Sequence, residues 1–373
     1  MLEKNINLDG KTILVTGAAG FIGANLCCML LEKFKDVILV GIDSMNDYYD
    51  VSLKEYRLAQ IKEVQKNSGG SFIFVKGNIA DFNLVKHLFC KYTPNLVVNL
   101  AAQAGVRYSI TNPDAYIEAN VMGFYNILEA CRHSYDEGKE GVDHLIYASS
   151  SSVYGNSKKI PYSTNDKADN PVSLYAATKK SNELFAYAYS KLYDIPSTGL
   201  RFFTVYGPAG RPDMAYFGFT DKLVNNETIQ IFNYGNCKRD FTYIEDIVKG
   251  IAEVMQRRPC NDKEGVRYKL YNIGNNQPEN LLDFVKILET ELKSAGVLAK
   301  EYNLDEHMKF VEMQSGDVEM TYADVRELEE DFSFKPSISL QEGLREFAKW
   351  YKKYRDLKQV SDDKREKRWA VKL

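Results

Sequence analysis

The chain has 373 residues, which is long enough to bury a large core and to form two lobes. Its hydrophobic and charged fractions, 45% and 27%, are typical of a globular protein, and the net charge of −3 argues against a nucleic-acid partner. The N-terminus shows neither a signal peptide nor an apolar run long enough to span a bilayer, so we expect a cytoplasmic protein without membrane contact.

The first elements in the chain indicate a dinucleotide-binding turn. A β-branched strand over residues 11–16 runs into a glycine-rich turn, and a helix to about Phe34 and a strand over residues 37–42 follow. Glycines let the backbone approach a pyrophosphate, and the helix N-terminus offers free N–H groups. Asp43 ends the second strand, where it can accept from both ribose hydroxyls and would repel a 2′-phosphate, so NAD is preferred over NADP. The predicted cofactor contacts in the turn are Gly17, Gly20, Phe21, Ile22 and Gly23.

Strands and helices continue to alternate up to residue 203. The expected strands cover residues 72–76, 95–100, 145–148 and 197–203, and the expected helices cover residues 81–90, 113–133 and a span from near Ser173. This alternation predicts an α/β fold with a Rossmann-type doubly wound parallel sheet, whose ligands bind at the carboxyl ends of the strands.

The stretch 144–180 carries the candidate catalytic residues. Its apolar strand stops in four serines, residues 149–152, and the next helix places Tyr175 and Lys179 one turn apart on one face. A neighbouring cation favours the phenolate, and such a phenol can remove the proton of an alcohol near neutral pH. The same Tyr-x-x-x-Lys spacing occurs at five other places, but only Tyr175 follows a strand that ends in serines.

After residue 203 the alternation gives way to a loop over residues 204–214. Helical patterns near residues 216–225 and 281–294 and a short strand at 229–233 then predict a smaller lobe that closes over the sheet. The expected division is a cofactor domain of residues 1–203 plus 241–275, a substrate lobe of residues 204–240 plus 276–350, and a basic tail of residues 351–373.

The charged residues of the tail and the scattered cysteines and histidines suggest no further site. Residues 352–373 hold nine Lys or Arg and four Asp or Glu, and we favour a solvated terminal helix over a membrane or polyanion contact. The six cysteines show no Cys-x-x-Cys pairing, which indicates free thiols in a reducing compartment. The four histidines lack ligand spacing, so we expect no metal.

In this order the motifs resemble the extended short-chain dehydrogenase/reductases that act on nucleotide sugars. The resemblance covers roughly residues 10–350 and rests on the glycine turn, Asp43, residues 149–155, the Tyr175/Lys179 pair and residues 239–241. Within that family the chain is most similar to the UDP-glucuronate 4-epimerases, and the specific marks are residues 46–50, 101–109 and 207–214. The resemblance implies a smaller C-terminal lobe that binds a UDP-sugar, NAD as the cofactor, and a homodimer that pairs the helices near residues 113–133 and 173–192.

The resemblance also implies roles for individual residues. Tyr175 would take the proton of the sugar 4-hydroxyl, Lys179 would hold the nicotinamide ribose and lower the pKa of the phenol, and Ser150 would be the catalytic hydroxyl. Further cofactor contacts would be Asn46, Asn78, Ile79, Leu100, Ala101, Ala102, Gln103, Asn120 and Phe202. Substrate contacts would be Arg107, Ser151, Ser152, Thr204, Arg211, Arg239 and Asp317. Two positions depart from the family pattern: Asn78 replaces a usual Asp, and Gln314 replaces a phosphate-binding arginine of some relatives.

The implied reaction is the NAD-dependent 4-epimerisation of UDP-glucuronate to UDP-galacturonate through a transient 4-keto sugar. Arg211 would read the sugar carboxylate through two parallel hydrogen bonds, whereas in the simpler interpretation it only orders its loop. The alternatives are a UDP-glucose or UDP-N-acetylhexosamine 4-epimerase, a UDP-glucuronate decarboxylase, and a non-enzymatic NAD-binding regulatory protein. A 4,6-dehydratase is disfavoured because Ser151 and Ser152 lie where dehydration needs carboxyl groups.

Overall fold

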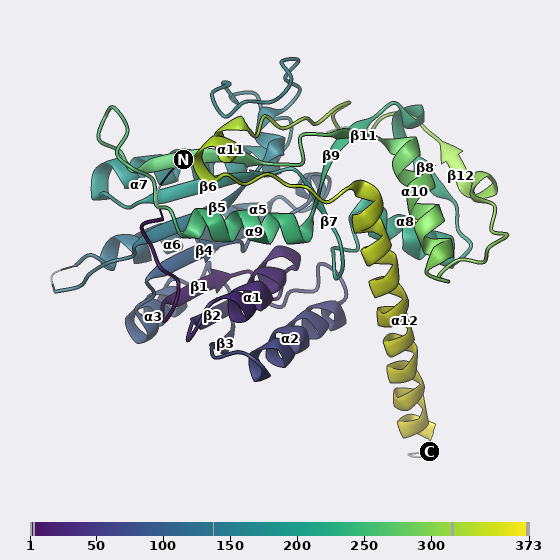
Figure 1. Ribbon diagram of the computed structural model, residues 1–373, viewed down its shortest axis with the longest axis horizontal. Coiled ribbons are helices and arrows are strands. Elements are labelled where there is room, and N and C mark those ends of the chain that lie inside the picture. Colours follow the sequence, from purple (N-terminus) through teal and green to yellow (C-terminus); the bar gives the residue numbers. More distant parts are fainter. Residues whose placement is uncertain (1, 3, 137, 315–316, 371–373) are drawn as a thin grey trace.

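A seven-stranded parallel sheet forms the centre of the computed structural model, which describes residues 2, 4–136, 138–314 and 317–370, with the backbone alone for residues 359–370 (Figure 1). The strand order is β10-β6-β5-β4-β1-β2-β3 and every pairing is parallel. The strands are β1 (Thr12–Thr16), β2 (Ile38–Asp43), β3 (Ser71–Lys76), β4 (Leu96–Asn99), β5 (His144–Ser150), β6 (Ser197–Phe202) and β10 (Tyr268–Ile273). The predicted Rossmann-type sheet is confirmed, and its strand order reverses between β1 and β4, where such sheets bind ligands.

Helices cover both faces of this sheet (Figure 1). They are α1 (Phe21–Lys33), α2 (Val51–Lys66), α3 (Phe82–Tyr92), α4 (Tyr108–Thr111), α5 (Asp114–Tyr116), α6 (Gly123–His133), α7 (Leu174–Tyr193) and α9 (Ile244–Met255). The expected helix over residues 113–133 is interrupted by a π-helical turn, η1 (Ile117–Met122), between α5 and α6. Such wide turns insert an extra residue into a helix and occur often at functional sites.

The remaining elements include two small sheets and four further helices. One sheet has the order β11-β9-β7, made of β11 (Pro278–Asn280), β9 (Lys238–Tyr243) and β7 (Thr204–Tyr206). A second pairs β12 (Met308–Phe310) with β8 (Ile229–Ile231). The helices are α8 (Ala215–Val224), α10 (Leu281–Ser294), α11 (Arg326–Phe332) and α12 (Leu340–Ala370). Strand β9 runs across the expected boundary at residues 240 and 241, so the domain division stays a prediction.

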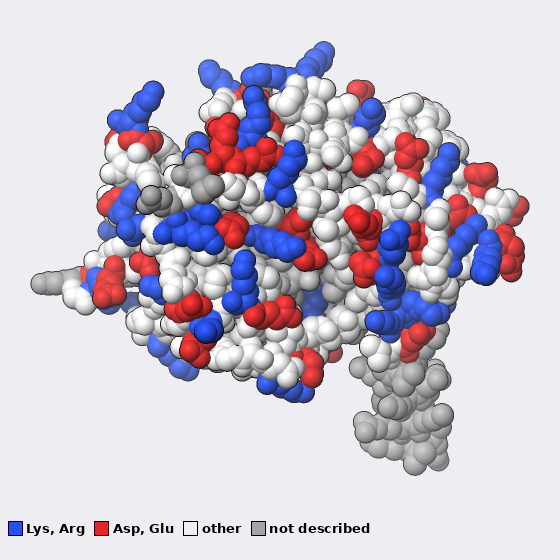
Figure 2. Space-filling view, viewed as in Figure 1, with Lys and Arg blue, Asp and Glu red and all other residues white. Residues whose placement is uncertain are grey.

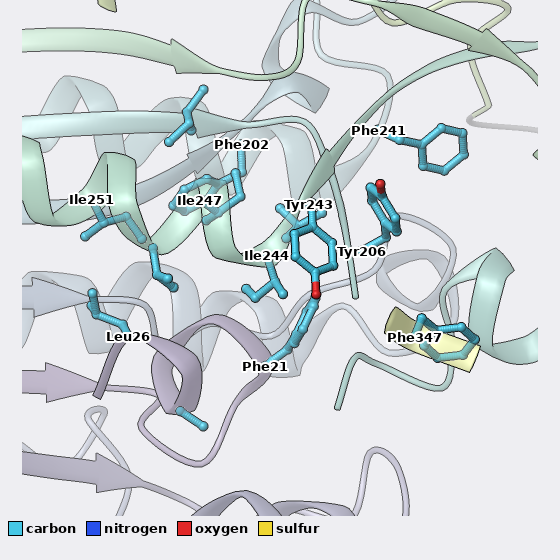
Figure 3. Close-up of a cluster of buried hydrophobic side chains, with 14 of the residues drawn as sticks. Phe21, Leu26, Phe202, Tyr206, Phe241, Tyr243, Ile244, Ile247, Ile251 and Phe347 are labelled. Carbon is cyan, nitrogen blue, oxygen red and sulfur yellow. The ribbon is translucent and has the colours of Figure 1, made fainter. Parts of the chain in front are cut away.

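One hydrophobic core joins the two parts. Figure 3 shows Ile244, Ile247 and Ile251 of α9 near Phe21 and Leu26 of the α1 region. The same cluster includes three aromatic side chains from later elements, Tyr206 of β7, Phe241 of β9 and Phe347 of α12 (Figure 3). Each fully buried side chain of this kind contributes about 1.5–3 kcal/mol to folding. The glycine turn at the start of α1 is therefore anchored on the same core as β7 and β9.

Helix α12 projects away from the body of the protein, and acidic and basic side chains are interspersed on the face shown in Figure 2. Trp350 fixes its first half, because the indole Nε1 donates to Tyr56 Oη at 3.1 Å and the ring stacks on Tyr354. Trp369 and the basic side chains beyond residue 358 lie outside the described residues. Within the described part of the chain, no helix is long and apolar enough to cross a membrane, and no cluster of His, Cys, Asp or Glu could hold a metal.

His144 at the start of β5 predicts a pH dependence of stability. The ring is fully buried with Nε2 2.8 Å from Thr198 Oγ1, and burial lowers its pKa from 6.5 to about 3. A depressed pKa stabilises the fold above the unfolded value and loses that effect as the pH falls towards the folded value. Between about pH 7.5 and about pH 5.5 this residue should lower the free energy of unfolding by about 1.4 kcal/mol. Urea unfolding of the parent protein and His144→Gln at both pH values measures the difference, and equal pH dependence in the two proteins would contradict it.

Candidate active site

A cavity at the carboxyl ends of strands β1 to β6 collects most of the predicted site residues. They lie in the glycine turn after β1, at or just after the ends of the other five strands, on helix α7 and in the loop after β7. The predicted residues that line the cavity are Gly17, Gly20, Phe21, Ile22, Gly23, Asp43, Asn46, Asn78, Ile79, Leu100, Ala101, Ala102, Gln103, Ser150, Tyr175, Lys179, Phe202 and Arg211.

The glycine turn brings the backbone close to the strand β4 loop. Gly17 has a φ of +69°, and a Cβ there would lie 2.9 Å from the backbone nitrogen of Ala101. A Cβ on Gly23 would lie 2.2 Å from the carbonyl oxygen of Gly17, so only glycine lets α1 begin this close to β1. The turn thus leaves room for a diphosphate at the N-terminus of α1.

Asp43 is held rigidly at the end of β2. Its Oδ2 accepts from the backbone N–H of Ala19 at 3.1 Å, and its Oδ1 accepts from that of Met45 at 2.9 Å. Lys54 Nζ lies 3.8 Å from Oδ1 and donates to Asn46 Oδ1 at 2.7 Å. A carboxylate has lone pairs beyond these two bonds, so the donors and acceptors here fit the adenosine ribose of NAD.

Asn78 follows β3 and lies at the far end of the same cavity. Its Oδ1 accepts from the backbone N–H of Ala80 at 2.9 Å, and its Nδ2 donates to Glu118 Oε1 at 2.8 Å. The Asn that replaces the family's usual Asp therefore joins the β3 loop to η1. An Asp would not supply the N–H donor of this contact with Glu118.

Helix α7 presents the Tyr175/Lys179 pair to the cavity. Ser173 begins the helix, because its side chain accepts from the backbone N–H of Ala176 at 3.1 Å. Lys179 is 3% exposed, and its Nζ donates to the carbonyl of Ala148 on β5 at 2.9 Å. Burial lowers the pKa of Lys179 from its usual 10.5 to about 8.

The environment of Tyr175 differs from the expectation. Burial raises the pKa of its phenol above the usual 10.0, whereas a hydrogen bond with Ser150 and the charge of Arg211 lower it and the charge of Asp213 raises it. The ammonium of Lys179 points to Ala148 instead, so the predicted lowering of this pKa by Lys179 is not seen. The groups that favour the phenolate are Ser150 and Arg211.

The serine cluster divides between the two faces of the sheet, because successive strand residues point in opposite directions. Ser149 Oγ donates to the buried carboxylate of Glu183 at 2.7 Å. Ser150 Oγ lies 3.1 Å from Ser152 Oγ and accepts from the backbone N–H of Ser152, at the start of the 3₁₀ turn η2 (Ser151–Tyr154). Ser150 lines the cavity together with Tyr175, and it is the serine that lowers the pKa of the phenol.

Arg211 lies on the loop that follows β7 and faces the same cavity. Its Nε and Nη2 donate to the two carboxylate oxygens of Asp213 at 3.0 and 2.6 Å. Burial lowers the pKa of Arg211, but the charge and hydrogen bonds of Asp213 outweigh burial and raise it above the usual value. Tyr48 Oη also donates to Asp213, at 3.3 Å. Asp213 therefore holds the guanidinium in one orientation, and these two bonds use Nε and Nη2 but not Nη1.

Several predicted residues do not line this cavity. Asn120 is 1% exposed. Its Oδ1 accepts from the backbone N–H of Gln103 at 2.8 Å, and its Nδ2 donates to the carbonyl of Gln103 at 3.0 Å and to Thr178 Oγ1. Asn120 therefore positions the loop that carries Gln103, whereas we expected it to face the cavity. Arg107 donates to Asp317 Oδ2 at 2.9 Å, which joins two predicted substrate residues that are 210 positions apart in sequence. The others outside the cavity are Ser151, Ser152, Thr204 and Arg239.

Three charged residues in or beside the cavity are absent from the sequence predictions. Lys54 and Arg57 both come from the buried face of α2, and Asp213 is the partner of Arg211. The sequence signal for the α2 pair was the i, i+3 spacing of two cations within residues 46–66, a span that already carried one family mark. For Asp213 the sequence signal was its negative charge two residues after the positively charged Arg211.

Comparison with known proteins places this geometry among nucleotide-sugar enzymes. The model of the family described as GDP-mannose 4,6 dehydratase matches residues 14–347. The chain is 42% identical over 356 residues to UDP-glucuronate 4-epimerase 4 of Arabidopsis thaliana, covering 93% of this chain and 76% of that protein. It is 48% identical over 353 residues to Protein CapI of Staphylococcus aureus, covering 92% and 98%. The crystal structure of UDP-glucuronic acid 4-epimerase from Bacillus cereus with UDP-glucuronic acid and NAD is similar at a TM-score of 0.76 and 31% identity, covering 92% and 99%.

Proposed function

The chain belongs to the extended short-chain dehydrogenase/reductases that act on nucleotide sugars, and we propose that it is an NAD-dependent 4-epimerase that interconverts UDP-glucuronate and UDP-galacturonate. One observation carries the proposal: Tyr175, Ser150, Lys179 and Arg211 line a single cavity together with the glycine turn and Asp43. A phenol that can exchange a proton and a guanidinium that can bind a carboxylate therefore lie beside a dinucleotide site.

The side chains divide the reaction into proton transfer and positioning. NAD, which the glycine turn and Asp43 would hold, would supply hydride transfer from and back to C4 of the sugar. Tyr175 removes the proton of the 4-hydroxyl and gives it back, and Ser150 stabilises the phenol oxygen through the hydrogen bond between them. Lys179, held by the carbonyl of Ala148, binds the cofactor ribose and supplies positive charge. The reaction has no net oxidation, so the cofactor stays in place between turnovers.

Arg211 accounts for the choice of a uronic acid. A guanidinium binds a carboxylate through two parallel hydrogen bonds, which fixes the plane of that carboxylate. A 4-keto uronic acid is a β-keto acid and loses carbon dioxide when the bond to its carboxylate aligns with the ketone π-system. A fixed carboxylate plane holds that bond out of alignment, and this favours epimerisation over decarboxylation. Around the UDP group, we propose contacts from Arg107, Arg239 and Asp317, with Ser151, Ser152 and Thr204 near the sugar.

Proton NMR of the purified protein with UDP-glucuronate tests the function directly. We expect the 4-epimer as the product, with neither a pentose nor a stable keto sugar, and NAD released when the protein is denatured. A pentose product would assign a UDP-glucuronate decarboxylase. Turnover of UDP-glucose or a UDP-N-acetylhexosamine in place of UDP-glucuronate would assign a neutral-sugar epimerase. No product with any UDP-sugar would favour the regulatory protein.

We also propose that the protein is a homodimer that pairs the surfaces of η1, α6 and α7. Large apolar side chains are exposed there, and isolated patches of this kind on a monomer usually mark an interface. On η1 and α6 they are Ile117, Met122 and Tyr125, and on α7 they are Leu184, Phe185 and Leu192, of which Leu192 is 69% exposed. Helices α6 and α7 pack together, which supports one continuous apolar surface made by these residues.

Leu184→Asp is expected to convert this dimer into a monomer, because it places a charge in an apolar interface. Leu184 is 59% exposed on α7, so the substitution should leave the monomer fold intact. Leu357→Asp is the matched control, since Leu357 is 60% exposed on α12, away from this surface. Sedimentation velocity of both variants measures the result. A monomeric parent protein, or a Leu184→Asp variant that sediments like the parent, would contradict the proposed interface.

The six unpaired cysteines favour a reducing compartment, and we place the enzyme in the cytoplasm on that ground. Its product keeps the UDP group, which is a leaving group for glycosyl transfer. We therefore infer a role in polysaccharide biosynthesis, with a glycosyltransferase as the class of enzyme that consumes the product.

A further inference from the structure

Arg57 on α2 binds backbone from two distant segments of the active site. Its side chain is 1% exposed, and Nε and Nη2 donate to the carbonyls of Ala209 and Gly210 at 2.9 Å each. Nη1 donates to the carbonyl of Ala19 at 3.1 Å and to Tyr49 Oη at 2.5 Å. One guanidinium therefore ties the glycine turn to the loop that carries Arg211.

The buried guanidinium of Arg57 has a free-energy cost that its hydrogen bonds must offset. Within the described residues Arg57 forms no ion pair, and three of its four acceptors are backbone carbonyls. Burying a cation without a carboxylate costs several kcal/mol unless oriented dipoles replace the lost water. The planar fork of Arg can bond several fixed carbonyls at once, which the flexible ammonium of Lys does less well. The arrangement suits a side chain whose purpose is to fix backbone geometry.

The loop that Arg57 holds contains a residue in an unfavourable backbone conformation. Ala209 has a φ of +55°, in the left-handed region that residues with a Cβ rarely occupy. A Cβ on Gly210 would lie 1.7 Å from Tyr216 Oη, so the chain passes close to that ring. The next residue is Arg211, whose guanidinium lines the cavity. A shift at the two carbonyls held by Arg57 would therefore move Arg211 directly.

We propose that Arg57 is a positioning residue for sugar recognition: it fixes the loop of residues 207–214 against the cofactor turn and so aims Arg211 at the carboxylate of the UDP-sugar. This inference rests on the proposed function. It predicts that loss of the Arg57 contacts weakens recognition of the carboxylate while leaving recognition of UDP unchanged. A misplacement of about 1 Å in such a group can lower a rate by on the order of 100-fold.

The test compares Arg57→Met with the parent protein on three ligands. Dissociation constants for UDP-glucuronate, UDP-glucose and UDP are measured by calorimetry on the NAD-loaded proteins, and kcat and KM are measured for UDP-glucuronate. Lys62→Met is the matched control, because Lys62 is an exposed cation on the same helix. We expect Arg57→Met to bind UDP-glucuronate at least roughly tenfold more weakly, with KM affected more than kcat, and to bind UDP and UDP-glucose as the parent does.

The experiment tests the role of Arg57 and the proposed function separately. Turnover of UDP-glucuronate by the parent protein establishes the function, whatever Arg57→Met does. A folded Arg57→Met that keeps the parent preference for UDP-glucuronate over UDP-glucose would overturn the inference, and so would equal weakening for all three ligands. If Arg57→Met does not fold, Arg57→Lys decides: a reduced preference supports the inference, and the parent preference refutes it.

Discussion

Tyr175→Phe is expected to lower kcat for UDP-glucuronate by roughly 10²–10⁴-fold, because it removes the oxygen that accepts the 4-hydroxyl proton. The fold should not change, since the ring stays in place and keeps its edge-to-face contact with Tyr116 at 6.0 Å. NAD and UDP-glucuronate should still bind, because neither depends on the phenol oxygen for its charged contacts. Steady-state kinetics and NAD content of the purified variant measure both effects.

Tyr187→Phe is the matched control for this prediction. Tyr187 lies on the same helix and has the same spacing to Lys191, but its hydroxyl donates to Glu264 at 3.1 Å, away from the cavity. The control should keep the parent activity. If Tyr175→Phe converted UDP-glucuronate at the parent rate, the proposed acid–base role of Tyr175 would be ruled out.

Arg201→Met is expected to lower the free energy of unfolding by about 3–5 kcal/mol. Arg201 Nε and Nη2 donate to the two carboxylate oxygens of Glu183 at 2.7 and 2.8 Å, and the two side chains are 1% and 2% exposed. Burial raises the pKa of Glu183, but Arg201 outweighs burial and holds that pKa below its usual value. Without Arg201 the carboxylate of Glu183 would be buried with only Ser149 and Lys180 as partners.

The size of the effect distinguishes a buried pair from an exposed one. Glu63 and Lys66 form an ion pair with side chains 63% and 68% exposed, so Lys66→Met should cost less than about 1 kcal/mol. Replacing Glu183 and Arg201 together by Met should recover part of the loss, because an apolar pair of similar volume is often as stable as a buried ion pair. Urea unfolding of the variants compares them. An Arg201→Met loss as small as that of Lys66→Met would show that the pair contributes little.

Local patterns were sufficient to predict the elements that hold the cofactor. The β1 strand, the glycine turn, α1 and the strand that ends at Asp43 were all expected, because each has a short apolar run or a glycine spacing that acts locally. The same holds for the helix that carries Tyr175 and Lys179. We could also expect the glycine turn, Asp43 and the Tyr175/Lys179 pair to lie in one cavity, because parallel strands present their carboxyl ends at one edge of the sheet.

Helix α2 was not among the expected elements for a physical reason. Its buried residues are Leu53, Lys54, Arg57 and Ile61, so two cations interrupt the apolar stripe that normally reveals an amphipathic helix. The sequence also did not predict ion pairs between residues that are far apart in the chain. Arg107 and Asp317 are 210 residues apart, and nothing in either segment indicates that they bind each other. The predicted effect of Lys179 on the pKa of Tyr175 stays a prediction, and nothing in the sequence indicated that the ammonium of Lys179 would donate to the carbonyl of Ala148.

The hydrophobic core that joins α1 and α9 to later elements limits how enzymes on this scaffold can diverge. Tyr206, Phe241 and Phe347 pack into the same core as residues of α1 and α9, so segments before and after residue 203 depend on one another for packing. A chimaera that took its sugar-binding half from a relative would bring mismatched side chains to that contact and would fold poorly unless both sides were exchanged together. New specificities should therefore arise by changes in short segments such as residues 207–214, which rest on this core without forming part of its centre.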